Sequence, residues 1–158
     1  MNRKTRFLTQ SALIASLYVA LTFVSATMGI ASGAIQVRLS EALTILPIFT
    51  VSAVPGLFVG CIVANLLTGA ALWDIVFGSI ATLIGAIGTR LFRKNRYLAT
   101  IPPILSNTII IPFVLKTAYG VADGYSFLFL TIFIGELISC GVLGIILSKA
   151  LSKTKIFE

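Results

Sequence analysis

Long apolar stretches separated by short polar ones run along the whole chain, and their lengths predict six helices. A helix needs about 20 residues to cross the hydrocarbon core of a bilayer, and most of these stretches approach or exceed that length. The pattern therefore predicts an all-α integral membrane protein, a compact bundle of six transmembrane helices. The predicted helices cover residues 7–29, 41–54, 56–72, 74–92, 97–117 and 125–149.

The division between the second and third helices rests on Pro55-Gly56, because a Pro-Gly pair is typical of a tight turn. Without that break, Ala42 to Trp73 would be a single run without charged residues. The alternative is five helices, with a long and kinked second one. The basic segment before the first helix also resembles the start of a signal peptide. However, the apolar run is longer than a signal h-region, so we interpret it as the first membrane helix.

Composition and charge support this interpretation and predict an orientation. The 158 residues are 58% hydrophobic and 11% charged, which fits one membrane domain over residues 1–158. Lys and Arg are enriched in cytoplasmic loops of membrane proteins. An even number of crossings with both termini cytoplasmic places ten of the twelve basic residues inside, and five crossings would place the C-terminal lysines outside. The inner set is Arg3, Lys4, Arg6, Arg90, Arg93, Lys94, Arg96, Lys149, Lys153 and Lys155, and the outer set is Arg38 and Lys116.

The first outer connection has a different pattern from the helices. Ile35, Val37 and Leu39 alternate with polar residues, and a period of two predicts an extended, half-buried segment. This segment would lie across the outer mouth of the bundle. It could contribute to a ligand site or be an interfacial loop without a ligand role, and both interpretations stay open.

A charged side chain at the centre of a bilayer costs roughly 2.5–3.5 kcal/mol on insertion scales, so it is a candidate functional group. Glu136 is the clearest case, because it lies about 16 Å along the last helix at about 1.5 Å per residue. It shares a helix face with Cys140, Gly144 and Ser148, and small residues mark faces that pack inside helix bundles. Glu136 is either a carboxylate that accepts hydrogen bonds from a ligand or a structural one.

Other polar residues offer two interpretations each. Asp74, at the start of the fourth helix, either caps that helix or binds a ligand. Trp73 is either an interfacial anchor or a stacking surface for a planar ligand. Asn65 and Asn107 either bridge helices or recognise the edge of a heterocycle, since an amide offers a donor and an acceptor.

Arg38 and Glu41 complete the candidate binding set. They lie three positions apart at the predicted mouth, where they pair with each other or flank an entrance. All the ionic and amide candidates map to the middle or outer half of the membrane, and a through-pore would have polar lining on both sides. The distribution therefore predicts a pocket that opens to the outside.

Several classes of function are disfavoured. The chain has no His, and its two cysteines lack metal-ligand spacing, so we expect no metal and no cofactor. It also lacks the usual hydrolase, metalloprotease and nucleotide-binding motifs, so we expect no enzymatic activity of its own. The basic residues are explained by membrane orientation, and we expect no nucleic-acid partner.

Three segments resemble the signature of the QueT family. They are Ile35-Gln36-Val37-Arg38-Leu39-Ser40-Glu41-Ala42-Leu43 followed by Leu46-Pro47, then Gly60-Cys61-Ile62-Val63-Ala64-Asn65-Leu66, then Asp74 to Leu83. Members of this family are substrate-binding S components of energy-coupling factor (ECF) importers for queuosine precursors, which are 7-deazaguanines. The alternatives are an S component for another vitamin or nucleobase, and a membrane scaffold protein that binds no ligand.

The resemblance implies a location and partners. It implies a multi-pass protein of a prokaryotic plasma membrane that works with a transmembrane coupling subunit and two cytoplasmic ATPases. In this superfamily small residues of the first helix dock on the coupling subunit, and Ala12 and Ser16 match those positions here. A deazaguanine presents N–H donors that Glu136, Asp74 or Glu41 could accept. Trp73 and the tyrosines Tyr18, Tyr119 and Tyr125 are the candidates for stacking on the ring.

Overall fold

The computed structural model describes residues 2–31 and 35–154, and within these ranges all regular elements are helical. Several consecutive elements join end to end, so that they form six helical segments. Four of the six are long and apolar enough to cross a membrane, and the second and third segments are shorter. The segments are α1 (Arg3–Thr27), η1 (Leu39–Ile48), α2 (Ala53–Leu67), η2 with α3 (Asp74–Gly78, Ser79–Leu91), η3 with α4 (Leu98–Thr100, Ile101–Tyr119), and α5, η4 and α6 (Tyr125–Glu136, Leu137–Leu143, Gly144–Leu151).

The predicted turn at Pro55-Gly56 is wrong. The chain turns earlier, between Phe49 and Ser52. Pro55 and Gly56 themselves lie in the first turns of α2. A proline is tolerated there because the first N–H groups of a helix have no partner within it. The second segment is also a tighter 3₁₀ helix and not the predicted α-helix over residues 41–54. The turn separates η1 from α2, so the five-helix alternative is excluded.

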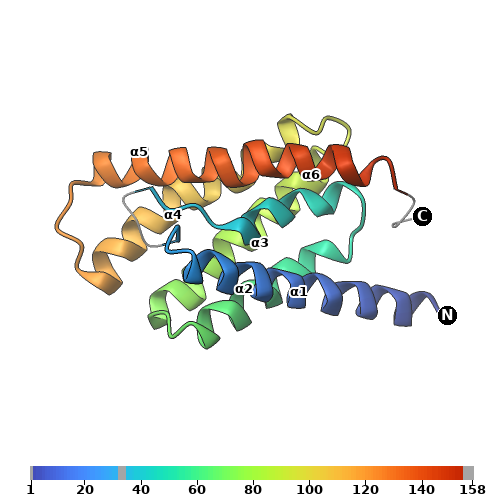
Figure 1. Ribbon diagram of the computed structural model, residues 1–158, viewed down its shortest axis with the longest axis horizontal. Coiled ribbons are helices and arrows are strands. Elements are labelled where there is room, and N and C mark those ends of the chain that lie inside the picture. The colour runs from blue at the N-terminus through green and yellow to red at the C-terminus, as the bar shows by residue number, and fades with distance from the viewer. Residues whose placement is uncertain (1, 32–34, 155–158) are drawn as a thin grey trace.

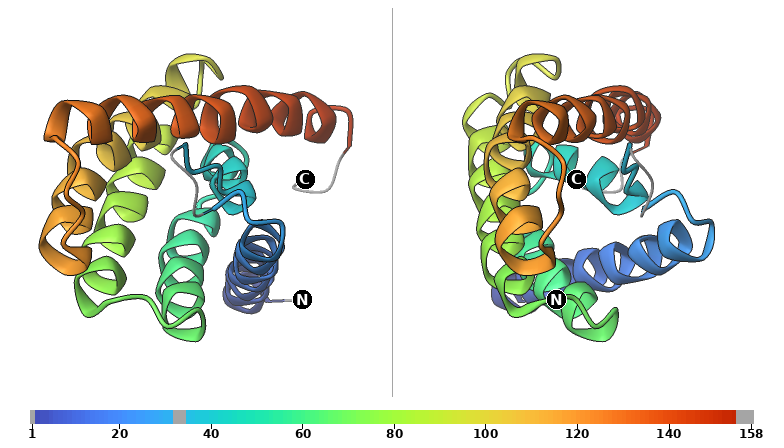
Figure 2. Two further views of the ribbon diagram at one scale, coloured as in Figure 1. Left: turned by 60° about the vertical axis from the view of Figure 1, so that its left-hand side comes forward. Right: turned by 90° about the vertical axis from the view of Figure 1, so that its left-hand side faces the viewer.

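The long C-terminal segment of α5, η4 and α6 runs along one side of the molecule, and α1 runs along the opposite side (Figure 1). The helix η1 lies between them and contacts both α1 and α6. The start of α1 and the end of α6 lie at the same end, as an even number of crossings requires. The turn after α3, at residues 92–97, is at this end too (Figures 1 and 2).

Glycines bring α1 and α2 into close contact. A Cβ on Gly56 would lie 2.8 Å from the carbonyl oxygen of Ser11, and one on Gly60 would lie 2.9 Å from Cβ of Tyr18. Helices associate in lipid through such small residues, because they let the backbones approach. The glycine stripe of α2 is therefore an internal packing surface, and it fixes the position of Tyr18 relative to the rest of the bundle.

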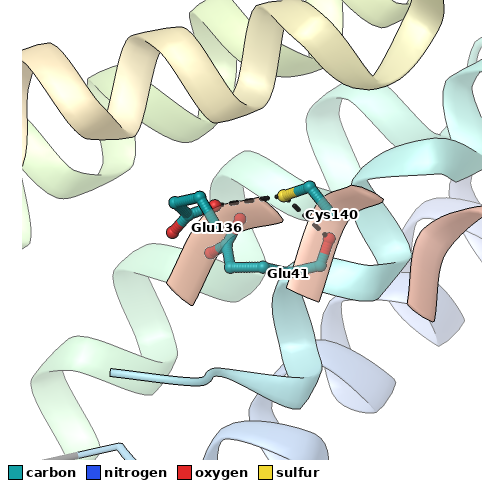
Figure 3. Close-up of side chains that lie close together, drawn as sticks. All are labelled: Glu41, Glu136 and Cys140. Carbon is teal, nitrogen blue, oxygen red and sulfur yellow. Dashed lines mark hydrogen bonds between the residues drawn. The ribbon is translucent and has the colours of Figure 1, made fainter. Parts of the chain in front are cut away.

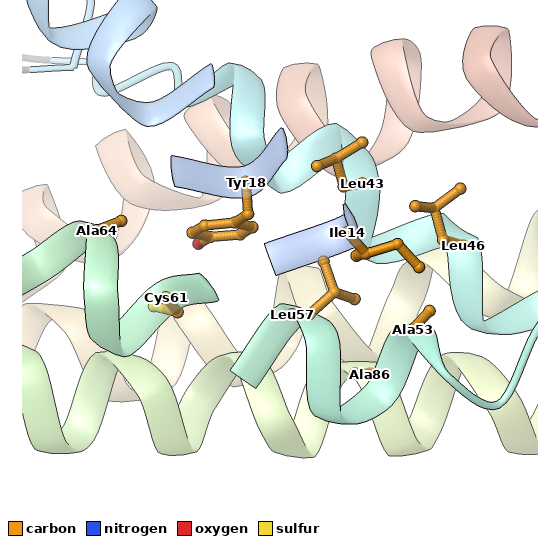
Figure 4. Close-up of a cluster of buried hydrophobic side chains, with 9 residues drawn as sticks. All are labelled: Ile14, Tyr18, Leu43, Leu46, Ala53, Leu57, Cys61, Ala64 and Ala86. Carbon is orange, nitrogen blue, oxygen red and sulfur yellow. The ribbon is translucent and has the colours of Figure 1, made fainter. Parts of the chain in front are cut away.

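An apolar cluster connects α1, η1, α2 and α3 (Figure 4). Ile14 and Leu57 lie at its centre and are almost fully buried. Tyr18 and Cys61 belong to the cluster and also contribute to the polar site described below: Cys61 lines its pocket, and the hydroxyl of Tyr18 bonds to Glu41. The cluster thus forms an apolar floor on one side of that site.

The segment before η1 is extended at Arg38, as the alternating pattern predicts, and it crosses between α1 and the C-terminal helix. The backbone N–H of Arg38 donates to Oγ of Ser139 at 3.2 Å, and that of Leu39 donates to Oγ of Ser25 at 2.8 Å. Its strict inward and outward alternation is not observed, because residues 36–39 are all half-buried. Gly135 allows the carbonyl group of Gln36 to pack directly against α5.

Candidate functional site

Two carboxylates from distant parts of the sequence meet inside the bundle. Glu41 lies in the first turn of η1, and Glu136 is the last residue of α5. Both are at least 93% buried, and one carboxylate oxygen of each lies within 4.8 Å of the other and of the Cys140 sulfur (Figure 3). Two buried acids this close are costly unless hydrogen bonds or a cation compensate them.

Hydrogen bonds from three segments orient the two acids. The hydroxyl of Tyr18 donates to Oε1 of Glu41, and Nδ2 of Asn107 donates to Oε2 of Glu41 at 3.4 Å. The thiol of Cys140 donates to Oε2 of Glu136 at 3.1 Å. The two donors to Glu41 come from other helices, α1 and α4, and the donor to Glu136 comes from the next turn of the same helical segment. These bonds hold the carboxylates in fixed positions.

A small polar pocket surrounds these acids, and we call it the deep pocket. Its cavity volume is about 10 Å³, which is about the room of one water molecule. Apolar side chains such as Ile111 and Ile132 close part of it. Its polar lining consists of Gln36, Arg38, Glu41, Thr82, Asn107 and Glu136.

A larger cavity of about 330 Å³ lies next to the deep pocket, and we call it the vestibule. Residues from the C-terminal ends of α1 and α2 line it, so it is at the end of the bundle opposite the start of α1 (Figure 1). Arg38 lines both cavities. The polar lining of the vestibule consists of Thr22, Arg38, Asn65, Thr68, Asp74 and Tyr119.

Asp74 lies at the boundary between the two cavities. The hydroxyl of Tyr119 donates to its Oδ2 at 3.1 Å, and its Oδ1 is buried without a hydrogen-bond partner. This Oδ1 would lie 3.0 Å from a Cβ on Gly78, a residue that lines the deep pocket. Asp74 makes no capping hydrogen bond, because its carboxylate bonds to Tyr119, so that part of the capping interpretation is wrong. It does lie in the first turn of its helix, where a carboxylate favours the helix dipole.

The other predicted candidates are placed as follows. Asn65 bridges two helices, with Nδ2 donating to the backbone carbonyl of Asp74 at 3.2 Å. Arg38 and Glu41 make no ion pair, and the Arg38 guanidinium has no hydrogen bond to any residue in the described ranges. Trp73 is 53% exposed and does not reach either polar cavity. It stacks on Phe77 with the ring centroids 5.4 Å apart, in an apolar groove between η2 and α4.

Sequence reasoning missed part of this site. Tyr18 was expected only as a stacking surface, and the structure makes it a hydrogen-bond donor to Glu41. Gln36, Thr82 and Cys140 border the acids without having been singled out as ligands. One signal was present for Cys140, since it follows Glu136 by four positions and lies on the same helix face.

The acids and the thiol together could also hold a metal ion, since Glu41, Glu136 and Cys140 each present one donor atom. However, both Glu41 oxygens already accept hydrogen bonds, and the thiol donates to Glu136. To ligate a metal, the thiol would have to lose its proton and with it the bond to Glu136. A ligand N–H needs no such change, because each carboxylate oxygen can accept more than one hydrogen bond, so the donor set fits an organic hydrogen-bond donor better than a metal ion.

The small residues of α1 lie on two faces with different surroundings. Ser11 and Ala15 pack against the glycines of α2. Ala12 and Ser16 are exposed on the other face, and Oγ of Ser16 donates to the carbonyl of Ala12 at 3.0 Å within the helix. The exposed face is therefore not used to pack this bundle.

Fold and site define a multi-pass helical membrane protein with an acidic pocket enclosed among its helices. The chain belongs to the QueT transporter family, because the family model described as QueT transporter matches residues 8–153. This agrees with the resemblance of its three sequence segments.

One relative is the queuosine precursor transporter QueT of Lactococcus lactis subsp. cremoris (strain MG1363), which is 32% identical over 93 residues. The aligned region is 58% of this chain and 54% of that protein, so the chain matches about half of the length of this relative. No solved structure matches the chain.

Proposed function

We propose that this protein is the substrate-binding S component of an ECF importer and that it captures a queuosine precursor, a 7-deazaguanine. Membership of the QueT transporter family supports a transport function. The printed name of the Lactococcus lactis relative supports a queuosine precursor as the substrate class.

The observation that carries the proposal is the meeting of Glu41 and Glu136 beside the vestibule. A deazaguanine presents N–H donors on one edge, and a carboxylate can accept two of them side by side. Hydrogen bonds to an ionised acceptor are about twice as strong as neutral ones. Buried acids held by fixed donors therefore supply both affinity and selectivity for a ligand rich in N–H groups.

The orientation follows from the charge distribution. We place both termini in the cytoplasm of a prokaryotic cell and the vestibule on the outer side of the plasma membrane. The basic turn at residues 92–97 and the start of α1 lie at one end of the bundle, and the C-terminal ends of α1 and α2 lie at the other (Figure 1). Residues at those C-terminal ends line the vestibule. Basic residues favour the cytoplasmic side, so capture occurs from outside.

Release then requires partners, because nothing in the sequence indicates nucleotide binding. We propose that a transmembrane coupling subunit and two cytoplasmic ATPases drive reorientation of the protein and release of the ligand inside. The exposed face of Ala12 and Ser16 supports this, since small exposed residues allow another helix to approach closely.

Binding is tested by a thermal-shift titration of the detergent-purified protein with 7-deazaguanines, with guanine and thiamine as comparison ligands. We expect selective stabilisation by the 7-deazaguanines. Glu136→Gln should lower that affinity by about 10- to 100-fold, which corresponds to about 1.5–3 kcal/mol for a hydrogen bond to a charged group. Trp73→Leu is the matched control and should leave the affinity unchanged, because Trp73 lies outside both cavities.

Stabilisation by thiamine alone would indicate an S component for another vitamin. If no small molecule in the series stabilised the protein, the scaffold interpretation would gain support and the proposal would fail. Partner docking is tested separately by co-purification with the coupling subunit and ATPases. Ser16→Trp should reduce co-purification and spare ligand binding, whereas Ile84→Trp, a substitution at an exposed position on α3, should reduce neither.

A further inference from the structure

The apolar groove between η2 and α4 has a volume of about 270 Å³ and lies outside both polar cavities. It follows α4 for about two turns, from Ile109 to Thr117, and the stacked rings of Trp73 and Phe77 form its opposite wall. Ile109, Phe113 and Trp73 are each about half exposed, so the groove faces away from the interior of the bundle. Both helices belong to segments long and apolar enough to cross a membrane. The groove therefore opens to the hydrocarbon of the bilayer.

The lining of the groove decides what can fill it. A buried water molecule needs about 2–4 polar partners, and the surface of the lining is almost entirely apolar. Inside a bilayer, close packing favours association, because lipid tails are as apolar as the side chains they replace. An acyl chain is narrow and flexible, so it can pack along the groove where water cannot.

A cation lies beside the groove. Lys116 follows Phe113 by three positions on α4, and its Nζ lies 4.8 Å from the ring centroid of Tyr125. Tyr125 in turn contacts Phe113, with the ring centroids 5.2 Å apart. Lys116 makes no hydrogen bond or ion pair within the described ranges. Asp74, the acid beside the opposite wall, is only 6% exposed, so it leaves the charge of Lys116 available to an anion from the membrane.

The position of Lys116 matches that of a lipid headgroup. Tyr119, the last residue of α4, lines the vestibule together with residues at the C-terminal ends of α1 and α2. Lys116 and Thr117 are therefore near the end of the bundle, where a lysine side chain extends to the membrane interface. Trp73, on the other wall, belongs to a residue type that is enriched at that interface. The groove thus runs from the interface into the hydrocarbon, as a phospholipid does.

We propose that this groove binds one anionic glycerophospholipid, with an acyl chain between η2 and α4 and its phosphate on the ammonium group of Lys116. The site goes beyond the proposed transport function, because it uses neither the deep pocket nor the vestibule. It also holds whatever substrate the protein carries.

Trp73 is the only tryptophan of the chain, so its fluorescence reports on the groove directly. The full-length protein is reconstituted into phosphatidylcholine vesicles that contain either phosphatidylglycerol or phosphatidylcholine brominated in the middle of the acyl chains. Bromine quenches an indole ring on contact. We expect brominated phosphatidylglycerol to bind about 5-fold more tightly than brominated phosphatidylcholine, as for one lysine beside anionic lipid.

Substitutions separate the headgroup contact from the acyl-chain contact. Lys116→Met should bring the preference for phosphatidylglycerol down to about 1 and leave quenching by phosphatidylcholine unchanged. Lys149→Met, which removes an exposed lysine from α6, should keep the preference of about 5-fold. Ile109→Phe fills the groove and should reduce quenching by both lipids, whereas Ile84→Phe, at an exposed position on α3, should not. The melting temperature of each variant controls for folding.

Equal quenching of the wild-type protein by the two lipids would mean that only bulk lipid surrounds Trp73, and it would overturn the proposal. An undiminished preference in Lys116→Met would contradict the phosphate contact. If neither lipid quenched Trp73 and light scattering showed a dimer, a second copy of the chain would cover the groove, and the lipid site would be refuted. None of these results bears on the binding of a substrate in the polar cavities.

Discussion

Replacing Gly135 by Ala should move the segment before η1, which forms one wall of the deep pocket through Gln36 and Arg38. A Cβ at this position would overlap the carbonyl oxygen of Gln36 and lie 3.0 Å from its carbonyl carbon. The obstacle is backbone on both sides, because α5 is a regular helix and the segment is fixed by Ser25 and Ser139. The segment therefore has to shift away from α5, and Gln36 and Arg38 shift with it.

The expected cost follows from these contacts. Overpacking costs about 1–3 kcal/mol, and each of the two hydrogen bonds that fix the segment contributes about 0.5–1.5 kcal/mol if it is lost. Gly144→Ala is the matched control, because its Cβ would meet Ala42 O at 3.6 Å and Ile45 Cβ at 3.7 Å, which are ordinary contacts. Both substitutions gain the same helix propensity, up to about 1 kcal/mol, so the difference between them isolates the clash.

Thermal unfolding in detergent micelles measures this difference. At about 2–4 °C per kcal/mol for a chain of this size, Gly135→Ala should melt at least about 2–4 °C below Gly144→Ala. Its ligand affinity should also fall, because Gln36 and Arg38 line the pocket. Equal melting temperatures for the two variants would refute the close packing of the segment on α5.

Two further substitutions test contacts that hold the bundle together. Tyr18→Phe removes a donor to the buried Glu41 carboxylate, so the free energy of unfolding should fall by about 1.5–3 kcal/mol. The control Tyr97→Phe, at a position 58% exposed, should leave the free energy of unfolding almost unchanged. Equal losses in the two variants would contradict the role of Tyr18. Arg90→Met removes bonds from the guanidinium to the carbonyls of Pro47 and Ile48 at 2.9 and 3.4 Å, and should cost about 1–3 kcal/mol in denaturant unfolding in mixed micelles. Arg93→Met is its control, and the reasoning fails if that variant is destabilised as much.

Much of the fold follows from local sequence. Hydrophobic runs and their lengths predicted the helical class, the six segments and the approximate bounds of four of them, because a chain in lipid must satisfy its own backbone hydrogen bonds. The error at Pro55-Gly56 shows the limit of this reasoning. A proline disrupts a helix only after its first turn, and the position where α2 begins depends on how closely the preceding residues pack on η1 and α1.

The candidate site shows the same limit. The cost of burying charge singled out Glu136, Glu41 and Asp74 from the sequence. Trp73 was grouped with these acids because it lies beside Asp74 in the chain. In the structure the two side chains leave the helix in different directions, so that Asp74 is buried and Trp73 is exposed. Tyr18 carried no sequence signal for a bond to Glu41, since they are 23 positions apart.

The sequence by itself determined that this protein is helical, lies in a membrane, carries acids within its apolar segments and resembles the QueT family. These properties depend on composition and on residues within a turn or two of each other. The tertiary structure decided that Glu41 and Glu136 share one pocket, that Asp74 is at its boundary and that Trp73 is outside it. The physical reason is that these placements depend on close approaches between distant segments, such as Gly60 against Tyr18 and Gly135 against Gln36, which no local pattern records.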